Sequence, residues 1–144
     1  MSVSLKRMCM AGIILMAAGG ALAHDEAKPS AADAADGTAI VPLLSKPLPD
    51  VPGKEALMLT VEYAPGASTP RHRHDAHVFV YVLSGSIIMQ ADGAPAVTLT
   101  PGQTFYESPT DVHAVSRNAS ATQPAKFLVF MLKPAGSSPV LPAQ

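Results

Sequence analysis

Proline and glycine occur too often along this chain for long helices to form. Fourteen prolines and ten glycines are spread over 144 residues, and each proline removes a backbone donor and clashes with the preceding helical turn. No stretch repeats its apolar residues with a helical period, whereas short alternating runs recur between the interruptions. The chain is therefore predicted to be built from short β-strands.

Alternating side chains identify these strands. In residues 55–63, Leu57, Leu59 and Val61 alternate with other side chains, which is the pattern of a sheet with one buried face. Residues 78–83 are rich in β-branched and aromatic side chains. About eight or nine such strands at close spacing favour an all-β fold, a small antiparallel β-barrel or sandwich. The clearest strands span residues 55–63, 78–83, 86–91, 97–100, 103–107, 113–117 and 126–132.

The first residues have the composition of an export signal. Lys6 and Arg7 precede an apolar run over residues 8–22 that ends in a small-x-small cleavage pattern. This run is shorter than the roughly 20 residues that span a bilayer, so residues 1–23 are predicted to be a signal peptide, with a retained membrane anchor as the alternative. The mature chain would be periplasmic or secreted, without a membrane attachment. Cleavage would also remove Cys9, the only cysteine, and with it any thiol chemistry.

Composition divides the rest of the chain. Residues 24–39 are small, polar and alanine-rich, which predicts a flexible leader. Residues 40–132 contain the strands and are predicted to form one domain, because a chain of this length suits a single core. Residues 133–144 contain three prolines and a glycine and are predicted to form a disordered tail.

The charge of the chain excludes a nucleic-acid partner. The formal net charge is -1, tryptophan is absent and aromatic residues make up 5%. Nucleic-acid binding calls for a basic surface or for aromatic side chains on which bases stack. A small-molecule ligand is the expected partner.

Histidines are concentrated in one segment. Three of the five lie within six residues, at His72, His74 and His77. Alternate residues of a strand point to the same face, so His72 and His74 are predicted to project side by side as half of a metal site. His113 would complete the site if the fold brings a distant strand opposite this pair, leaving further coordination positions open. The alternative is a set of ordinary surface or hydrogen-bonded histidines.

These residues resemble the two sequence motifs of the cupin family. The matching positions are Gly66, His72, His74 and Gly85 in the first motif, and Gly102 and His113 in the second. The resemblance covers about residues 40–132 and is to small single-domain bacterial cupins, because the segment between the motifs is short. It implies a jelly-roll β-barrel, also called a double-stranded β-helix. It also implies one divalent metal ion (iron, manganese, nickel, copper or zinc) on the motif histidines.

The sequence departs from the first motif at its acidic residue. Val78 stands seven positions before Gly85, where the family has an acid. His77 lies one position earlier and has the opposite parity, so it would point inward only at a bulge. A site of three histidines is therefore predicted, with the fourth ligand open. Without a carboxylate the metal would keep its full charge, which favours an anionic or chelating ligand.

Glu107 is the predicted catalytic residue. It lies six residues before His113 in the segment that leads to this histidine. A carboxylate there would orient a metal ligand or act as a general acid or base. The alternative is a solvent-facing glutamate on an edge strand.

The predicted function is that of an exported, metal-dependent oxidoreductase, similar to a dioxygenase, that acts on a small chelating organic compound. One alternative is a binding module for a metal or small molecule without turnover. A second is a metal-assisted isomerase or decarboxylase, and a third is a barrel without a metal. The resemblance also suggests a homodimer, because exposed edge strands of small barrels often pair.

Overall fold

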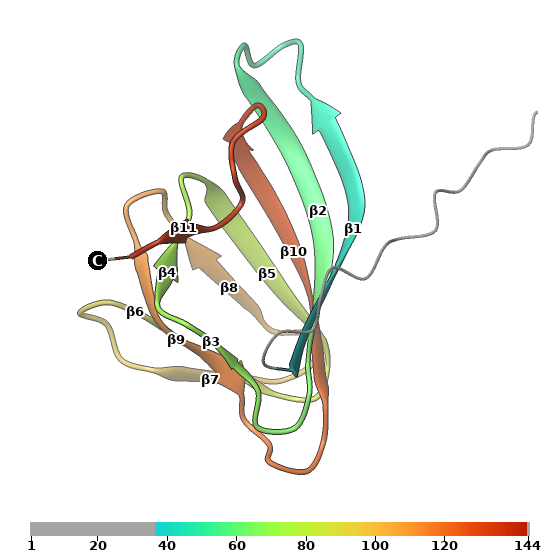
Figure 1. The fold of residues 1–144 in the computed structure, drawn as a ribbon, viewed down its shortest axis with the longest axis vertical. Coiled ribbons are helices and arrows are strands. Elements are labelled where there is room, and N and C mark those ends of the chain that lie inside the picture. Colours follow the sequence, from blue (N-terminus) through green and yellow to red (C-terminus); the bar gives the residue numbers. More distant parts are fainter. Residues whose placement is uncertain (1–36, 144) are drawn as a thin grey trace, which may run out of the picture.

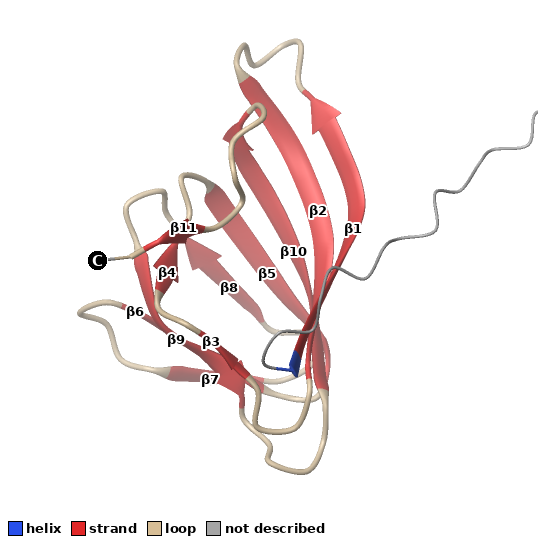
Figure 2. Cartoon of the chain, viewed as in Figure 1, coloured by secondary structure: helices blue, strands red, loops and turns tan. Residues whose placement is uncertain are grey.

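The computed structural model describes residues 37–143, which form two antiparallel β-sheets that face each other (Figure 1 and Figure 2). The predicted signal peptide and residues 24–36 of the predicted leader lie outside the described residues. Across residues 37–143, no helix has the length and apolar character needed to cross a membrane.

The first sheet contains five strands in the order β1-β2-β10-β5-β8. Strands β2 and β10 pair along their whole length. Buried and partly buried residues alternate strictly along β10, because one face of this sheet forms the core. The strands are β1 (Thr38–Pro47), β2 (Lys54–Tyr63), β10 (Ala125–Pro134), β5 (His77–Ser84) and β8 (Thr104–Glu107).

The second sheet has its strands in the order β11-β4-β9-β6-β7, and β3 also pairs with β9. Strand β9 is therefore the common partner of three strands. The short strand β4 brings His72 against His113 of β9. The strands are β11 (Leu141–Pro142), β4 (His72–Arg73), β9 (Val112–Asn118), β6 (Ile87–Ala91), β7 (Val97–Leu99) and β3 (Ser68–Thr69).

The core lies between the two sheets. Val78, Val80 and Val82 of β5 are at most 2% exposed, and Ile87 and Met89 of β6 are at most 1% exposed. The all-β fold predicted from the sequence is confirmed. In residues 37–143 no strand pairing joins the two sheets, so the fold is a jelly roll of two facing sheets without closure into a continuous barrel.

Strand β1 begins slightly before the predicted start of the domain. Thr38 and Ala39 pair with Tyr63 and Glu62 of β2, so the end of the predicted leader belongs to the first sheet. The register of β1 shifts at Pro42. Proline is tolerated there because β1 is an edge strand with one unpaired side.

The C-terminal residues differ from the disordered tail predicted for residues 133–144. Lys133 is 3% exposed, its ammonium group pairs with the carboxylate of Glu55, and it donates a hydrogen bond of 2.6 Å to the carbonyl of Ser137. Beyond this anchor, β11 pairs with β4. The sequence did not indicate this order, because the partners of Lys133 on β2 and of β11 on β4 are remote in sequence.

Candidate metal centre

The structure brings His72, His74 and His113 together. His72 of β4 is paired directly with His113 of β9, and side chains of such a pair are neighbours on the same face of a sheet. The ring centre of His72 lies 4.9 Å from that of His74 and 5.1 Å from that of His113. The rings of His74 and His113 are 5.9 Å apart. His113 thus comes from an adjacent strand of the same sheet, whereas the sequence predicted an opposite strand.

Glu107 approaches these histidines from the other sheet. It is the last residue of β8 and is 3% exposed. Its Oε1 lies 2.8 Å from Nε2 of His113, and its Oε2 lies 3.4 Å from Nε2 of His74. The alternative of a solvent-facing glutamate does not describe this buried position. Glu107 is also the paired neighbour of Val78 on β5, the residue at the position of the missing acid.

In two of the histidines, a hydrogen bond to a backbone carbonyl determines which ring nitrogen carries the proton. Nδ1 of His72 donates to the carbonyl of Pro70 at 2.7 Å, and Nδ1 of His74 donates to the carbonyl of Pro139 at 2.5 Å. A carbonyl only accepts hydrogen bonds, so in the neutral ring the lone pair is on Nε2. Such Nδ1–H to carbonyl bonds commonly orient histidines that ligate a metal.

His113 is buried without a hydrogen bond at either ring nitrogen. Its Nε2 is close to the carboxylate of Glu107, but the two groups are not aligned for a hydrogen bond. Buried polar groups normally have a partner. One carboxylate and three imidazoles form a donor set of nitrogen and oxygen that fits a divalent transition metal. In residues 37–143, however, no group of three or more potential ligands already has the geometry of a metal site, so binding would draw the side chains closer together.

Burial favours the neutral form of the His72 ring. Removal from water lowers the pKa of His72 below its ordinary value, and the neighbouring His74 and His113 lower it further. The hydrogen bond to Pro70 acts in the opposite direction but has a smaller effect than burial. The neutral imidazole, which is the form that binds metals, is therefore favoured at neutral pH.

The four side chains line a cavity of about 110 Å³ between the two sheets. Its other walls are largely apolar. Tyr63 also lines the cavity, and its hydroxyl shares hydrogen bonds with the hydroxyls of Ser116 at 2.8 Å and Thr69 at 3.2 Å. Burial raises the pKa of this phenol. The apolar lining comprises Ile40, Leu59, Val61, Val78, Val80, Met89, Phe127, Val129, Met131, Pro139 and Val140.

His77 lies on the opposite side of its strand, away from this cavity. It is exposed, and its Nδ1 is 2.7 Å from the hydroxyl of Tyr106, with which it shares a hydrogen bond. The strand parity predicted this outward orientation in the absence of a bulge. The register shift between β5 and β10 lies beyond Val82, near Ser84, and so does not turn His77 inward.

Sequence reasoning missed the backbone groups that support the site. Pro139 supplies the carbonyl for His74, and it lies in the segment that was predicted to be disordered. The apolar pair Val140 and Leu141 was the only sign in the sequence that this segment packs. For Glu107, a usable signal was its even spacing from Phe105, because both side chains point to the inner face of β8.

Several proteins of known structure are similar to this chain. An RmlC-like cupin from Shewanella frigidimarina NCIMB 400 has a TM-score of 0.59 and 16% identity, covering 76% of this chain and 87% of that chain. The polyketide cyclase RemF from Streptomyces resistomycificus has a TM-score of 0.53 and 23% identity, covering 71% and 73%. The Cupin_2 domain of an XRE family transcriptional regulator from Enterobacter cloacae has a TM-score of 0.52 and 26% identity, covering 66% and 95%.

Sequence comparison assigns the family. No curated protein matches the chain significantly. The family profile of the cupin domain (Cupin_2) matches residues 59–131, which is just over half of the chain and includes all four side chains of the candidate site. The chain therefore belongs to the cupin family.

Proposed function

We propose that this cupin binds one divalent transition metal ion through His72, His74 and His113, with Glu107 as a fourth ligand. We further propose that it oxidises a small chelating organic compound in a reaction like that of a dioxygenase. The observation that carries the proposal is the buried carboxylate of Glu107 beside the buried rings of His74 and His113, with the ring of His72 next to both of these rings. The predicted export to the periplasm or the outside of the cell remains part of this proposal.

The cavity limits the size of the compound. An apolar cavity of about 150 Å³ holds benzene, whereas sites for drug-sized ligands start at about 300 Å³. With about 110 Å³, this cavity suits a compound of a few heavy atoms. Its apolar walls would contact the hydrocarbon part. A divalent ion with one carboxylate ligand keeps a net positive charge, which would attract an anionic or chelating group.

The lining favours chemistry that the metal itself supplies. Besides the phenol of Tyr63, the titratable groups around the cavity are His72, His74, His113 and Glu107. If these four bind the metal, none is free to act as a general base. A bound redox-active metal would supply electron exchange with oxygen. The protein would hold the substrate's polar group at the histidine side and exclude water with its apolar walls.

A second candidate follows from the position of Glu107. It is the only carboxylate among the residues that line the cavity, so an uncoordinated Glu107 is the group that would move a proton in a metal-assisted isomerase or decarboxylase. The similar structures include a polyketide cyclase and a domain of a transcriptional regulator. A binding function without turnover is therefore the third reading to test.

Metal content tests the central claim. We expect the purified protein to carry about one divalent metal ion per chain and the double variant His72→Ala/His113→Ala to carry almost none, because few ligands remain. His77→Ala is the matched control, since this histidine lies on the outer face, and it should retain the metal. Circular dichroism would verify that each variant is folded. Equal metal content in the wild type and the folded double variant would overturn the proposal.

Oxygen consumption separates the candidate functions. The protein loaded with iron, manganese, nickel or copper would be incubated in an oxygen electrode with small carboxylic chelators of a few heavy atoms. Consumption that depends on both the metal and His113 supports the oxidoreductase. Conversion of a chelator without oxygen uptake favours the isomerase or decarboxylase, and tight binding without conversion favours the binding module.

A further inference from the structure

The wall of the cavity contains four hydroxyl groups in addition to the histidines and the carboxylate. They belong to Thr38, Tyr63, Thr69 and Ser116. The first two residues are paired on β1 and β2, and the other two are paired on β3 and β9. The hydrogen bond of 2.8 Å between Tyr63 and Ser116 joins the two pairs across the space between the sheets. We call these four residues the hydroxyl cluster.

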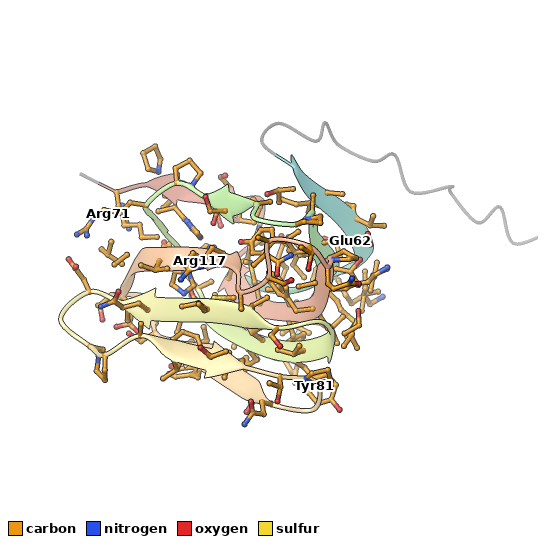
Figure 3. The ribbon with its side chains drawn as sticks, turned by 90° about the horizontal axis from the view of Figure 1, so that it is seen from below. Glu62, Arg71, Tyr81 and Arg117 are labelled. Atoms are coloured by element: carbon orange, nitrogen blue, oxygen red, sulfur yellow. The ribbon has the colours of Figure 1, made fainter. Side chains whose placement is uncertain are left out.

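The hydroxyl cluster lies at one end of the molecule. Strand β1 begins with Thr38 at the lower end of the view in Figure 1, and Figure 3 shows the molecule from that end. Glu62 and Arg117, which adjoin the cluster in the sequence and are labelled in Figure 3, are exposed. The polar side chains that line this end of the cavity are therefore uncharged hydroxyls.

A β-bulge brings a histidine and a hydroxyl of β9 into the same cavity. Because alternate residues of a strand face the same side, His113 and Ser116 would normally face opposite sides. Ala114 has no partner in the pairing of β6 with β9, where the register shifts. This extra residue returns both side chains to the inner face, and both are buried. They stand roughly 10 Å apart along the strand.

Thr38 has an unused hydroxyl group. It is 8% exposed, and its Oγ1 has no hydrogen-bond partner among the described residues. Buried polar groups normally have a partner. The hydroxyl of Tyr63 bonds to both other members of the cluster, and that of Ser116 also donates to the sulfur of Met89 at 3.4 Å. Thr38 is therefore the member of the cluster whose hydroxyl is free to bind a ligand.

We propose that the hydroxyl cluster binds an uncharged oxygen group of the substrate, whose carboxylate lies at the metal. This inference rests on the proposed function and narrows its substrate to a short carboxylic acid with a hydroxyl or carbonyl group at the far end. A chain of about four carbon atoms fits a separation of roughly 10 Å, because a contact at each end takes part of this distance. A second carboxylate is disfavoured there, since burying an unpaired charge costs far more than burying a hydroxyl.

Calorimetric titration with matched ligands tests the hydroxyl cluster. The probes are butanoate, 4-hydroxybutanoate and butanedioate, and the protein is loaded with zinc so that no oxidation takes place. We expect 4-hydroxybutanoate to bind about 3- to 10-fold more tightly than butanoate, which is the effect of one additional hydrogen bond. Butanedioate should bind more weakly than 4-hydroxybutanoate, because its second charge has no partner at this end.

Thr38→Val should abolish the preference for 4-hydroxybutanoate, because it keeps the shape of the side chain and removes the hydroxyl. Thr60→Val is the matched control and should keep the preference. Thr60 lies between Leu59 and Val61 on β2, whose side chains line the cavity, and so faces the other side of the sheet. Thr38→Val should also unfold at the same temperature as the wild type or a higher one, because the lost hydroxyl has no partner in the fold.

The zinc content of the same samples separates this proposal from the proposed function. Protein that binds zinc but shows equal affinity for butanoate and 4-hydroxybutanoate would overturn the proposed role of the cluster and leave the metal site intact. An unchanged preference in Thr38→Val, or a marked loss of its thermal stability, would overturn that role as well. Protein that binds no zinc would overturn both proposals. A preference that depends on Thr38, in a protein that consumes no oxygen when loaded with a redox-active metal, would support the cluster and reject the oxidoreductase.

Discussion

Glu107 and Val78 are paired residues on neighbouring strands. The resemblance to cupins leads one to expect an acid at Val78, whereas the structure places a buried carboxylate at its partner. Side chains of paired residues stand on the same face, about 5 Å apart. A carboxylate can therefore reach the same group of histidines from β8 as it would from β5, and in the proposed metal site Glu107 would take the place of the missing acid.

The position of this carboxylate on β8 predicts that Glu107 contributes to metal affinity. We expect Glu107→Gln to weaken metal binding by about 10- to 100-fold, a typical effect of losing a group that ligates or supports the metal. The double variant Val78→Glu/Glu107→Val should recover part of this affinity. Calorimetric titration of the metal-free protein would measure it, with Glu62→Gln on the exposed side of β2 as control. Wild-type affinity in Glu107→Gln would contradict the proposed role of the carboxylate.

Gly85 is required for a close approach between two turns. Its φ is +69°, and a Cβ at this position would lie 2.4 Å from the carbonyl oxygen of Pro124. Gly93 has a similar φ of +75° but no atom within 4 Å of the corresponding Cβ position. These two glycines therefore separate the effect of backbone conformation from that of steric contact.

We expect Gly85→Ala to reduce the free energy of unfolding by more than about 1 kcal/mol, the scale of the backbone strain alone. The loss in Gly93→Ala should be smaller, because only the backbone strain applies there. Urea unfolding of both variants would measure the difference. An equal loss at both positions would show that the contact with Pro124 has no energetic effect.

Among the structural elements, the C-terminal segment has a direct connection to the site. Its residues Pro139 and Val140 line the cavity, and the carbonyl of Pro139 binds Nδ1 of His74. Strand β11 holds the segment in place by pairing with β4. The segment therefore both orients a histidine and closes part of the cavity.

Truncation would test this connection. A chain that ends after Ser138 keeps the bond between Lys133 and Ser137 but lacks Pro139 and β11. We expect it to bind metal at least about 10-fold more weakly, since His74 loses its orienting partner. A chain that ends after Pro142 retains both features and is the control. If the two truncated chains bind metal equally well, the segment does not orient His74.

Strands β2 and β10 are joined at one end by the pair of Glu55 and Lys133. The hydrogen bond from Lys133, followed by that from the backbone of Gly136, holds the pKa of Glu55 below its usual value. A carboxyl group with a lowered pKa in the folded state stabilises the fold above the pKa of the unfolded chain. This contribution is lost as the pH falls through the folded-state pKa.

Glu55→Gln should therefore be less stable than the wild type at neutral pH, and the difference should shrink as the pH falls below about 4.5. Urea unfolding at several pH values would measure it. Glu62→Gln, which removes a glutamate paired with Lys126 at an exposed site, should show little difference at any pH because such pairs contribute little. A stability difference for Glu55→Gln that persists in acid would contradict the role of this charge.

At the scale of the whole molecule, the sequence predicted what depends on local patterns. The valines of β5 alternate with outward residues because one face of the sheet is buried, and the same parity places His72 with His74 and turns His77 outward. Pairing between remote segments leaves no comparable local pattern. The contacts of Glu107 with two histidines and the anchor at Lys133 therefore became visible only in the fold.

The pairing of His72 with His113 has a consequence for how the protein would acquire its metal. In the unfolded chain these residues are 41 positions apart, and the carbonyl that orients His74 comes from near the end of the chain. His72 and His113 thus come together, and His74 is oriented, only after β4 has paired with both β9 and β11, and unfolded chains rarely offer a preformed site. A chain exported unfolded would take its metal where it folds, so the metal supply of that compartment would decide which ion it carries.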